Sequence, residues 1–287
     1  MSLDVLAIQT LNGLTFSALL FLLASGFTLI FGLMRIVNLA HGSLYLVGGY
    51  MGVVTSVVTG SFLLAFIVGV ASAALLGLLA ERFLLRRVRG HELREVLLTV
   101  GIALVVADLS LALFGGKPQL LDVPEALSGS TELGPYRYPT YRLFVMLLAV
   151  GVGLALWFLQ HRTSLGARIR AGVDDREMAG ASGIDVDWLF AVLFVLGAGL
   201  AGLAGVAAAG MLTMRPGADT DILLFALVVV IVGGLGSVAG AAMGAVLIGL
   251  ADAFSRAWFP ELSYFAVFVP MALVLVLRPR GLLGASS

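Results

Sequence analysis

The sequence predicts an all-α, polytopic membrane protein with eight or nine transmembrane or half-spanning helices. Hydrophobic residues make up 60% of the chain, and the mean hydropathy is +1.09. Only 12% of the residues are charged, and they gather between apolar runs. Such runs approach the roughly 20 residues that a helix needs to cross a hydrocarbon core. No polar stretch is long enough for a second domain, so residues 1–287 are expected to form one transmembrane domain.

Each apolar run is taken as one hydrophobic segment. In chain order, the runs cover residues 9–34, 39–59, 61–79, 96–114, 143–159, 188–212, 222–254 and 264–277. The run at 222–254 is too long for one untilted crossing, and glycines interrupt it at 233–236. We therefore expect a hairpin of two passes there and nine passes in all.

The distribution of Lys and Arg predicts the orientation, because cytoplasmic loops are enriched in both. Placing the loop after the third run in the cytoplasm brings twelve basic residues inside: Arg35, Arg82, Arg86, Arg87, Arg89, Arg94, Arg162, Arg168, Arg170, Arg176, Arg278 and Arg280. Five remain outside: Lys117, Arg137, Arg142, Arg215 and Arg256. The N-terminus is then external and the C-terminus cytoplasmic.

Several chemistries are missing from the sequence. The chain has no Cys, and its three His are not at metal-ligand spacing, so no metal site is expected. Its single Lys, Lys117, is followed by Pro118, so there is no phosphate-binding GxxxxGK[ST] loop. We expect no catalytic residues, no cofactor bound by this chain and no nucleic-acid partner.

The segment at 161–187 is charged, unlike the runs on either side. Asp174 and Glu177 have the spacing of a helix capping box, and Gly183 offers a helix stop. Met178 and Ala179 form a small apolar surface between them. Two interpretations stay open: a solvated loop with a helical turn, or a short cytoplasmic helix that docks a partner.

Polar residues also interrupt the apolar sequence near residue 40. Asn38 and His41 stand between two apolar runs, next to Gly42. Polar groups at membrane depth are costly unless they are paired or line a cavity. The segment is therefore either an interfacial turn, with Asn38 capping the next helix, or a part of a translocation path. For His41 we expect a structural hydrogen bond more than direct substrate contact.

Glycines dominate residues 233–244. Gly236, Gly240 and Gly244 have the GxxxGxxxG spacing that allows close helix packing. The break at 233–236 would free backbone groups to face a water-filled cavity. Two isolated carboxylates, Asp108 and Asp252, leave a stand-alone, ion-coupled secondary transporter as a weaker alternative.

Five motifs in this order resemble those of branched-chain amino acid ABC transporter permeases of the LivH type. They are NLAHG at 38–42, LTVG at 98–101, GARIRA at 166–171 with Ala179 and Gly183-Ile184, GLAG at 202–205, and GGLGSVAG at 233–240. The resemblance runs from about residue 11 to residue 284. It implies a permease that moves leucine, isoleucine and valine into the cytoplasm; the same class also imports urea, short amides, other amino acids and aromatic acids.

The resemblance also implies a bacterial or archaeal plasma membrane and several partners. They are a related LivM-type permease, two cytoplasmic ATPase subunits that hold ATP and Mg, a periplasmic or lipid-anchored binding protein, and membrane lipid. The ATPases would be coupled through 161–187, namely Gly166, Arg168, Arg170, Asp174, Glu177, Met178, Ala179, Gly183 and Ile184. Translocation or gating would involve Asn38, His41, Gly42, Gly233, Gly234, Gly236, Ser237 and Gly240.

Overall fold

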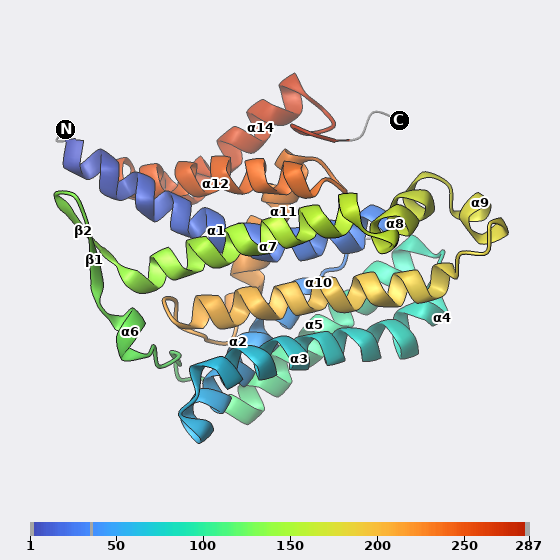
Figure 1. The fold of residues 1–287 in the computed structure, drawn as a ribbon, viewed down its shortest axis with the longest axis horizontal. Helices are drawn as coiled ribbons and strands as arrows, with labels where there is room; N and C mark the ends of the chain where they lie inside the picture. Colours follow the sequence, from blue (N-terminus) through green and yellow to red (C-terminus); the bar gives the residue numbers. More distant parts are fainter. Residues whose placement is uncertain (1–2, 35–36, 285–287) are drawn as a thin grey trace.

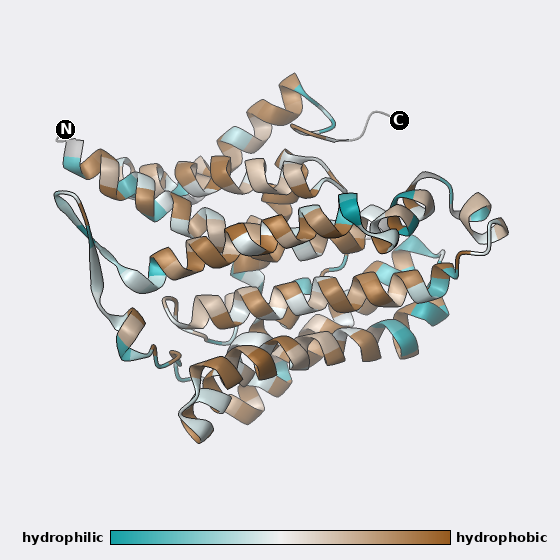
Figure 2. Cartoon of the chain, viewed as in Figure 1, coloured by the Kyte–Doolittle hydropathy of each residue, from teal (hydrophilic) through white to brown (hydrophobic). Residues whose placement is uncertain are grey.

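The computed structural model describes residues 3–34 and 37–284 and is a bundle of long helices (Figure 1). Seven described helices are long and apolar enough to cross a membrane. They are α1 (Leu3–Met34), α2 (His41–Thr59), α3 (Phe62–Ala80), α5 (Glu92–Phe114), α7 (Thr140–Arg162), α10 (Val186–Ala209) and α12 (Val238–Trp258). Hydrophobic residues follow these helices, and hydrophilic ones gather near their ends (Figure 2).

Shorter elements connect the long helices. A π-helical turn, η1 (Glu81–Leu85), joins α3 to α4 (Arg86–Val88). Between α5 and α7 lie α6 (Glu125–Ser128) and an antiparallel hairpin of β1 (Ser130–Leu133) and β2 (Tyr136–Pro139), in which Thr131 pairs with Tyr138. This hairpin, which the sequence interpretation did not include, lies at the end of the bundle that holds the N-terminus (Figure 1). The remaining elements are α8 (Ser164–Asp174), α9 (Arg176–Ala181), α11 (Ala218–Gly233), η2 (Pro260–Leu262), α13 (Ser263–Ala266) and α14 (Phe268–Leu277).

Glycine allows the central helices to approach closely. A Cβ added at Gly202 of α10 would meet the Cβ of Ala73 and, at 3.0 Å, the carbonyl oxygen of Gly69, both on α3. One turn later, a Cβ on Gly205 would run into the Tyr45 carbonyl of α2. Small residues at helix contacts are typical of membrane bundles, where close packing replaces the hydrophobic effect as the attraction between helices. Helix α10 therefore packs closely against both α2 and α3.

The predicted break in the run at 222–254 is confirmed. Helix α11 ends at Gly233, Gly234 has a φ of 104°, and α12 begins at Val238. Gly240 lies against the Gly233 carbonyl and Gly244 against the Val229 carbonyl, so the two helices run antiparallel. They form the expected hairpin.

The last run differs from its prediction. Residues 264–277 form most of the short helix α13 and the ten-residue helix α14, which is half the length that a crossing needs. Pro260 and Pro270 fall in this region, and proline interferes with regular helix hydrogen bonding. The described residues form nine hydrophobic segments, of which α11 with 16 residues and α14 with 10 are shorter than the rest.

The two ends of the described chain lie at opposite ends of the bundle (Figure 1). Near the N-terminus, Asp4 accepts a hydrogen bond from the Tyr136 hydroxyl of β2 at 3.0 Å. Near the C-terminus, the Leu282 and Leu283 amides donate to the carbonyls of Val232 and Gly233 at the break between α11 and α12. An odd number of crossings gives this arrangement. Arg35, one of the twelve basic residues counted inside, lies outside the described residues.

Candidate translocation and coupling sites

His41 lies deep inside the bundle, at the first residue of α2. Its Nε2 is 3.0 Å from the carbonyl oxygen of Leu23, and its ring meets Phe27 edge-on. Leu23 is eleven residues before the end of α1 at Met34. At 1.5 Å per residue, that places His41 roughly 16 Å from this end of α1. His41 thus makes the structural hydrogen bond expected for it, and α2 begins within the bundle rather than at its edge.

Asn38 is buried just before α2. Its Oδ1 accepts a hydrogen bond from the Ala40 amide at 3.1 Å, and its backbone carbonyl accepts one from the His41 amide. The side chain therefore organises the entry to α2 rather than capping the helix itself, whose first turn has no side-chain cap.

Two further residues join this polar interior, and sequence reasoning missed both. Asp219, in the first turn of α11, is buried. Its backbone carbonyl packs so closely against Gly42 that a Cβ at Gly42 would collide with it. Tyr50 of α2 is fully buried. Within the part of the chain that the structure describes, Asn38 Nδ2, His41 Nδ1, Tyr50 Oη and Asp219 Oδ1 have no hydrogen-bond partner. Buried polar groups are nearly always paired, so this group of four marks a candidate functional interior.

The break between α11 and α12 is shaped by one helix cap and by two glycines in the left-handed region. Ser237 caps α12, since its Oγ accepts a hydrogen bond from the Gly240 amide at 3.0 Å. Gly234 and Gly236 have positive φ angles of 104° and 84°. Gly236 therefore lies in the break, not on the α12 helix face, and the predicted three-glycine face is reduced to Gly240 and Gly244. Gly236 approaches Gly32 near the end of α1, so the break lies at the same end of the bundle as α8.

Helix α8 is fixed to the end of α7. Thr163 caps it by accepting a hydrogen bond from the Gly166 amide at 3.1 Å. A Cβ on Gly166 would strike the Leu159 and Gln160 carbonyls, and the Arg170 guanidinium donates to the Gln160 carbonyl. The same face of α8 buries Ile169, whereas Arg168 is exposed. Helix α8 is therefore amphipathic, with its apolar face on the bundle.

Helix α9 projects farther from the bundle than α8 (Figure 1). Its cap is Asp175, whose Oδ1 accepts a hydrogen bond from the Met178 amide at 2.9 Å. The predicted capping box of Asp174 and Glu177 is wrong by one residue, because α8 continues through Asp174. Met178 is 63% exposed and Glu177 is also exposed.

The end of α9 folds back on the bundle. Gly183 has a φ of 83°, and the Ile184 amide donates to the Ala179 carbonyl at 3.1 Å. This is the hydrogen bond of a glycine-terminated helix end. Ala179 is only 4% exposed. The expectation that Ala179 is part of an open docking surface is therefore wrong, because the chain itself covers this side chain while Met178 points outward.

A group of charges ties α3 and α4 to the residues that follow α9. Arg89 forms ion pairs with the buried Glu81 and with Asp187, and Arg86 also pairs with Asp187. The Arg89 guanidinium lies 4.2 Å from the ring centre of Phe190. Asp187 is in the first turn of α10, directly after the α8–α9 segment. We call Glu81, Arg89 and Asp187 the charged clasp; sequence reasoning missed Glu81 and Asp187 because no local pattern pairs them.

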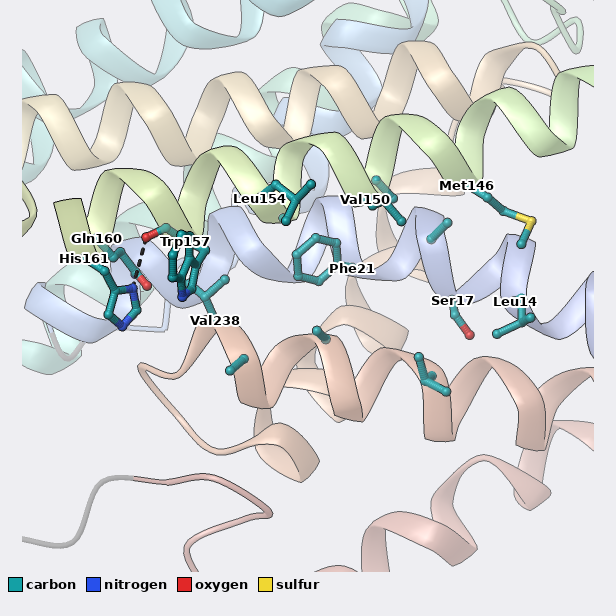
Figure 3. Close-up of a pocket in the computed structure, with 16 residues that line it drawn as sticks. Leu14, Ser17, Phe21, Met146, Val150, Leu154, Trp157, Gln160, His161 and Val238 are labelled. Atoms are coloured by element: carbon teal, nitrogen blue, oxygen red, sulfur yellow. Dashed lines mark hydrogen bonds between the residues drawn. The ribbon is translucent and has the colours of Figure 1, made fainter. Parts of the chain in front are cut away.

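A long groove of the described chain runs between α1, α7 and α12 (Figure 3). It measures about 530 Å³ and is lined by apolar side chains such as Phe21, Leu154 and Val238. Gln160 and His161 lie at its polar end, where the His161 ring nitrogen is 3.0 Å from the Trp157 carbonyl (Figure 3). None of the buried polar atoms near His41 lines this groove, so it is a separate feature.

Glycine-packed membrane helices around unpaired polar groups, with an amphipathic helix pair outside the bundle, are the architecture of a multi-pass transport permease. The sequence profile described as "Branched-chain amino acid transport system / permease component" matches residues 9–277. The chain belongs to this family.

Relatives named as branched-chain amino acid permeases are similar over nearly their whole length. The chain is 29% identical over 96% of its length to a high-affinity branched-chain amino acid transport system permease protein, BraD, of Pseudomonas aeruginosa, and covers 95% of it. It is 28% identical to the LivH protein of Escherichia coli, with 96% of this chain and 94% of that one covered. A putative glucose ABC transporter permease protein of Haloferax volcanii, TsgC13, is 29% identical over 68% of this chain and 60% of its own.

One solved structure has the same fold. It is that of PsaBC from Streptococcus pneumoniae in complex with Fab, with a TM-score of 0.50 and 15% identity. The match covers 93% of this chain and 89% of that chain. The likeness concerns the arrangement of helices and carries no information on substrate.

Proposed function

We propose that this chain is one permease subunit of an ATP-driven importer for branched-chain amino acids. In the proposed complex it pairs with a related permease, two cytoplasmic ATPase subunits and an external binding protein. ATP and Mg bind to the ATPases, and the permease itself hydrolyses nothing. The names of the similar proteins BraD and LivH support the substrate class.

The observation that carries this proposal is the α8–α9 segment. A helix pair outside the bundle, anchored by Ile169 and Ala179 and presenting Met178 and Glu177 outward, offers a rigid surface to a partner at one end. Burying a Met-sized side chain contributes roughly 1.5–3 kcal/mol. The charged clasp holds the start of α10, which directly follows this segment, against η1 and the end of α4. Motion imposed on α9 by an ATPase would therefore reach the central helices directly.

Within the bundle, the proposed path runs past the starts of α2 and α11. Discontinuous helices that begin at membrane depth bind substrates in many transporters. Here the start of α2 at His41 and the start of α11 near Asp219 meet at Gly42. The hairpin break at Gly233–Gly240 lies beside the end of α1 and is the proposed hinge.

Orientation is tested by labelling, which is simple because the chain has no cysteine. Glu132→Cys on β1 and Glu177→Cys on α9 lie at opposite ends of the bundle (Figure 1). An impermeant thiol reagent added to intact cells should label residue 132 and spare residue 177. The reverse labelling would overturn the proposed external N-terminus.

Transport is tested on the reconstituted complex. Vesicles that contain both permeases and both ATPases should take up leucine, isoleucine and valine when binding protein and ATP are supplied. Omitting either ATP or the binding protein should abolish uptake. Uptake that depends on an ion gradient and ignores ATP would replace this function with the ion-coupled alternative.

A further inference from the structure

A second cavity opens at the end of the bundle that holds the N-terminus. It measures about 280 Å³ and lies between α1, the loop that precedes α11, α11 itself and the end of α12. This volume is just below the 300–1,000 Å³ typical of small-molecule sites. It therefore suits a single small metabolite rather than a peptide or a lipid.

One wall of this cavity is apolar. Phe16 of α1 and Phe225 of α11 line it, with their ring centres 5.3 Å apart in an edge-to-face arrangement. Ile222, one turn before Phe225, also lines the cavity. Both phenylalanines are half-buried, so part of each ring faces the opening.

The lining also carries two ion pairs. Arg215 Nη2 is 2.9 Å from Asp221 Oδ2, and Arg256 Nε is 2.8 Å from Asp252 Oδ2. Arg215, Asp221 and Arg256 line the cavity. Each guanidinium has five N–H donors, so one ion pair leaves several free for another carboxylate. Asp221 likewise keeps acceptor capacity on a half-exposed side chain.

We propose that this cavity is an entry site for an amino-acid zwitterion with an aliphatic side chain. The proposal rests on the proposed transport function and adds a location and a recognition chemistry to it. The two ion pairs sum to no net charge, which matches a ligand that is itself neutral overall but carries both charges. A ligand with only a negative charge would be repelled by the carboxylates, and a ligand with only a positive charge would be repelled by the guanidinium groups.

The recognition follows from the groups present. Arg215 or Arg256 donates to the α-carboxylate, since guanidinium binds carboxylates with a matching fork of donors. Asp221 accepts from the α-ammonium group. The aliphatic side chain then packs on Phe16 and Phe225.

The experiment uses Thr213→Cys, because Thr213 lines the cavity and the chain has no other cysteine. In the complete reconstituted complex, leucine should slow alkylation of the new thiol. 4-Methylpentanoate, which is leucine without the ammonium group, and 3-methylbutylamine, which is leucine without the carboxylate, should each protect less, by on the order of tenfold or more in concentration. Ser128→Cys on α6, which is exposed and outside the cavity, is the matched control and should show no protection.

A second variant tests the assigned acceptor. In the Thr213→Cys background, Asp221→Asn should weaken protection by leucine and leave protection by 4-methylpentanoate undiminished, because the acid has no ammonium group for Asp221 to bind. If leucine fails to protect the thiol in vesicles that import leucine, or if 4-methylpentanoate protects equally well, the entry site is wrong while the transport function stands. If the vesicles import no branched-chain amino acid but leucine still protects, the transport function fails and the site remains.

Discussion

Helices α10 and α5 are equally apolar but occupy different environments. The most apolar window has a hydropathy of 2.4 in α10 and 2.5 in α5. Yet 67% of that window is buried in α10 and only 17% in α5. Hydropathy therefore identifies both as membrane helices but does not distinguish the helix at the centre of the bundle from the one on its outside.

Small residues make the distinction. Helix α10 carries Gly197, Gly202 and Gly205, and a Cβ at any of them would strike a neighbouring helix. In α5, a Cβ at Gly101 would meet no atom within 4 Å. Glycine has a packing role in α10 that it lacks in α5, and the outer face of α5 is left for lipid or for a partner.

The largest expected effect tests this contrast directly. Gly202→Leu forces a side chain into the Gly69 carbonyl and Ala73, which are backbone and close-packed neighbours. Overpacking of this kind costs about 1–3 kcal/mol or more. We expect little folded protein by size-exclusion chromatography after detergent extraction. Gly101→Leu is the control and should yield as much folded protein as the wild type; equal yields of the two variants would contradict the packing argument.

Two neighbouring residues of α9 offer the next test, because Ala179 is buried and Met178 is exposed. Ala179→Glu places a charge where the chain is already packed and should lower the thermal stability of the permease itself. Met178→Glu should leave that stability unchanged and reduce ATP hydrolysis stimulated by substrate, on the order of tenfold or more, since it removes roughly 1.5–3 kcal/mol of proposed contact. The measurements are the melting temperature of the isolated permease and the ATPase rate of the complex. Normal hydrolysis with Met178→Glu would show that α9 docks no ATPase.

The charged clasp gives an intermediate effect. Removing one partner of a buried pair leaves the other unpaired, and Glu81 is only 2% exposed. Arg89→Gln should therefore lower the unfolding temperature, whereas Arg86→Gln, on the more exposed pair with Asp187, should lower it much less. Thermal unfolding of the two variants in parallel measures the difference, and equal shifts would argue against a buried clasp.

His41 separates a polar requirement from a packing requirement. His41→Asn keeps a group that can hydrogen-bond to the Leu23 carbonyl, and His41→Leu does not. A typical hydrogen bond contributes about 0.5–1.5 kcal/mol. We expect leucine uptake to fall several-fold more with His41→Leu than with His41→Asn. Equal uptake by the two variants would show that the hydrogen bond has no role.

The smallest effect is expected from a substitution in the β-hairpin. Arg137 and Glu132 form an exposed ion pair at 2.9 Å. Exposed pairs are typically worth under about 1 kcal/mol. Arg137→Ala should leave both uptake and melting temperature near the wild-type values, and a clear loss of uptake would point to a binding partner at this hairpin.

Much of the fold followed from local patterns. The positions of the apolar runs predicted every long helix within a few residues, and the glycines at 233–236 predicted the hairpin of α11 and α12. The α8–α9 segment was recognised because its charge contrasts with the runs around it. The shortened α14 and the β-hairpin were missed, since an apolar run shows neither where a helix stops nor whether a short polar loop pairs with itself.

The sequence by itself determined that this protein is a multi-pass membrane permease, because hydropathy, glycine spacing and the order of motifs are all written along the chain. Only the tertiary structure decided which side of each helix faces inward. Ala179 and Met178 are adjacent in sequence, yet one is buried and the other exposed. Asp219 reaches Gly42, and Arg89 reaches Asp187, only because the helices cross. Such contacts depend on rotation and register between helices, which close packing in three dimensions sets and local sequence does not.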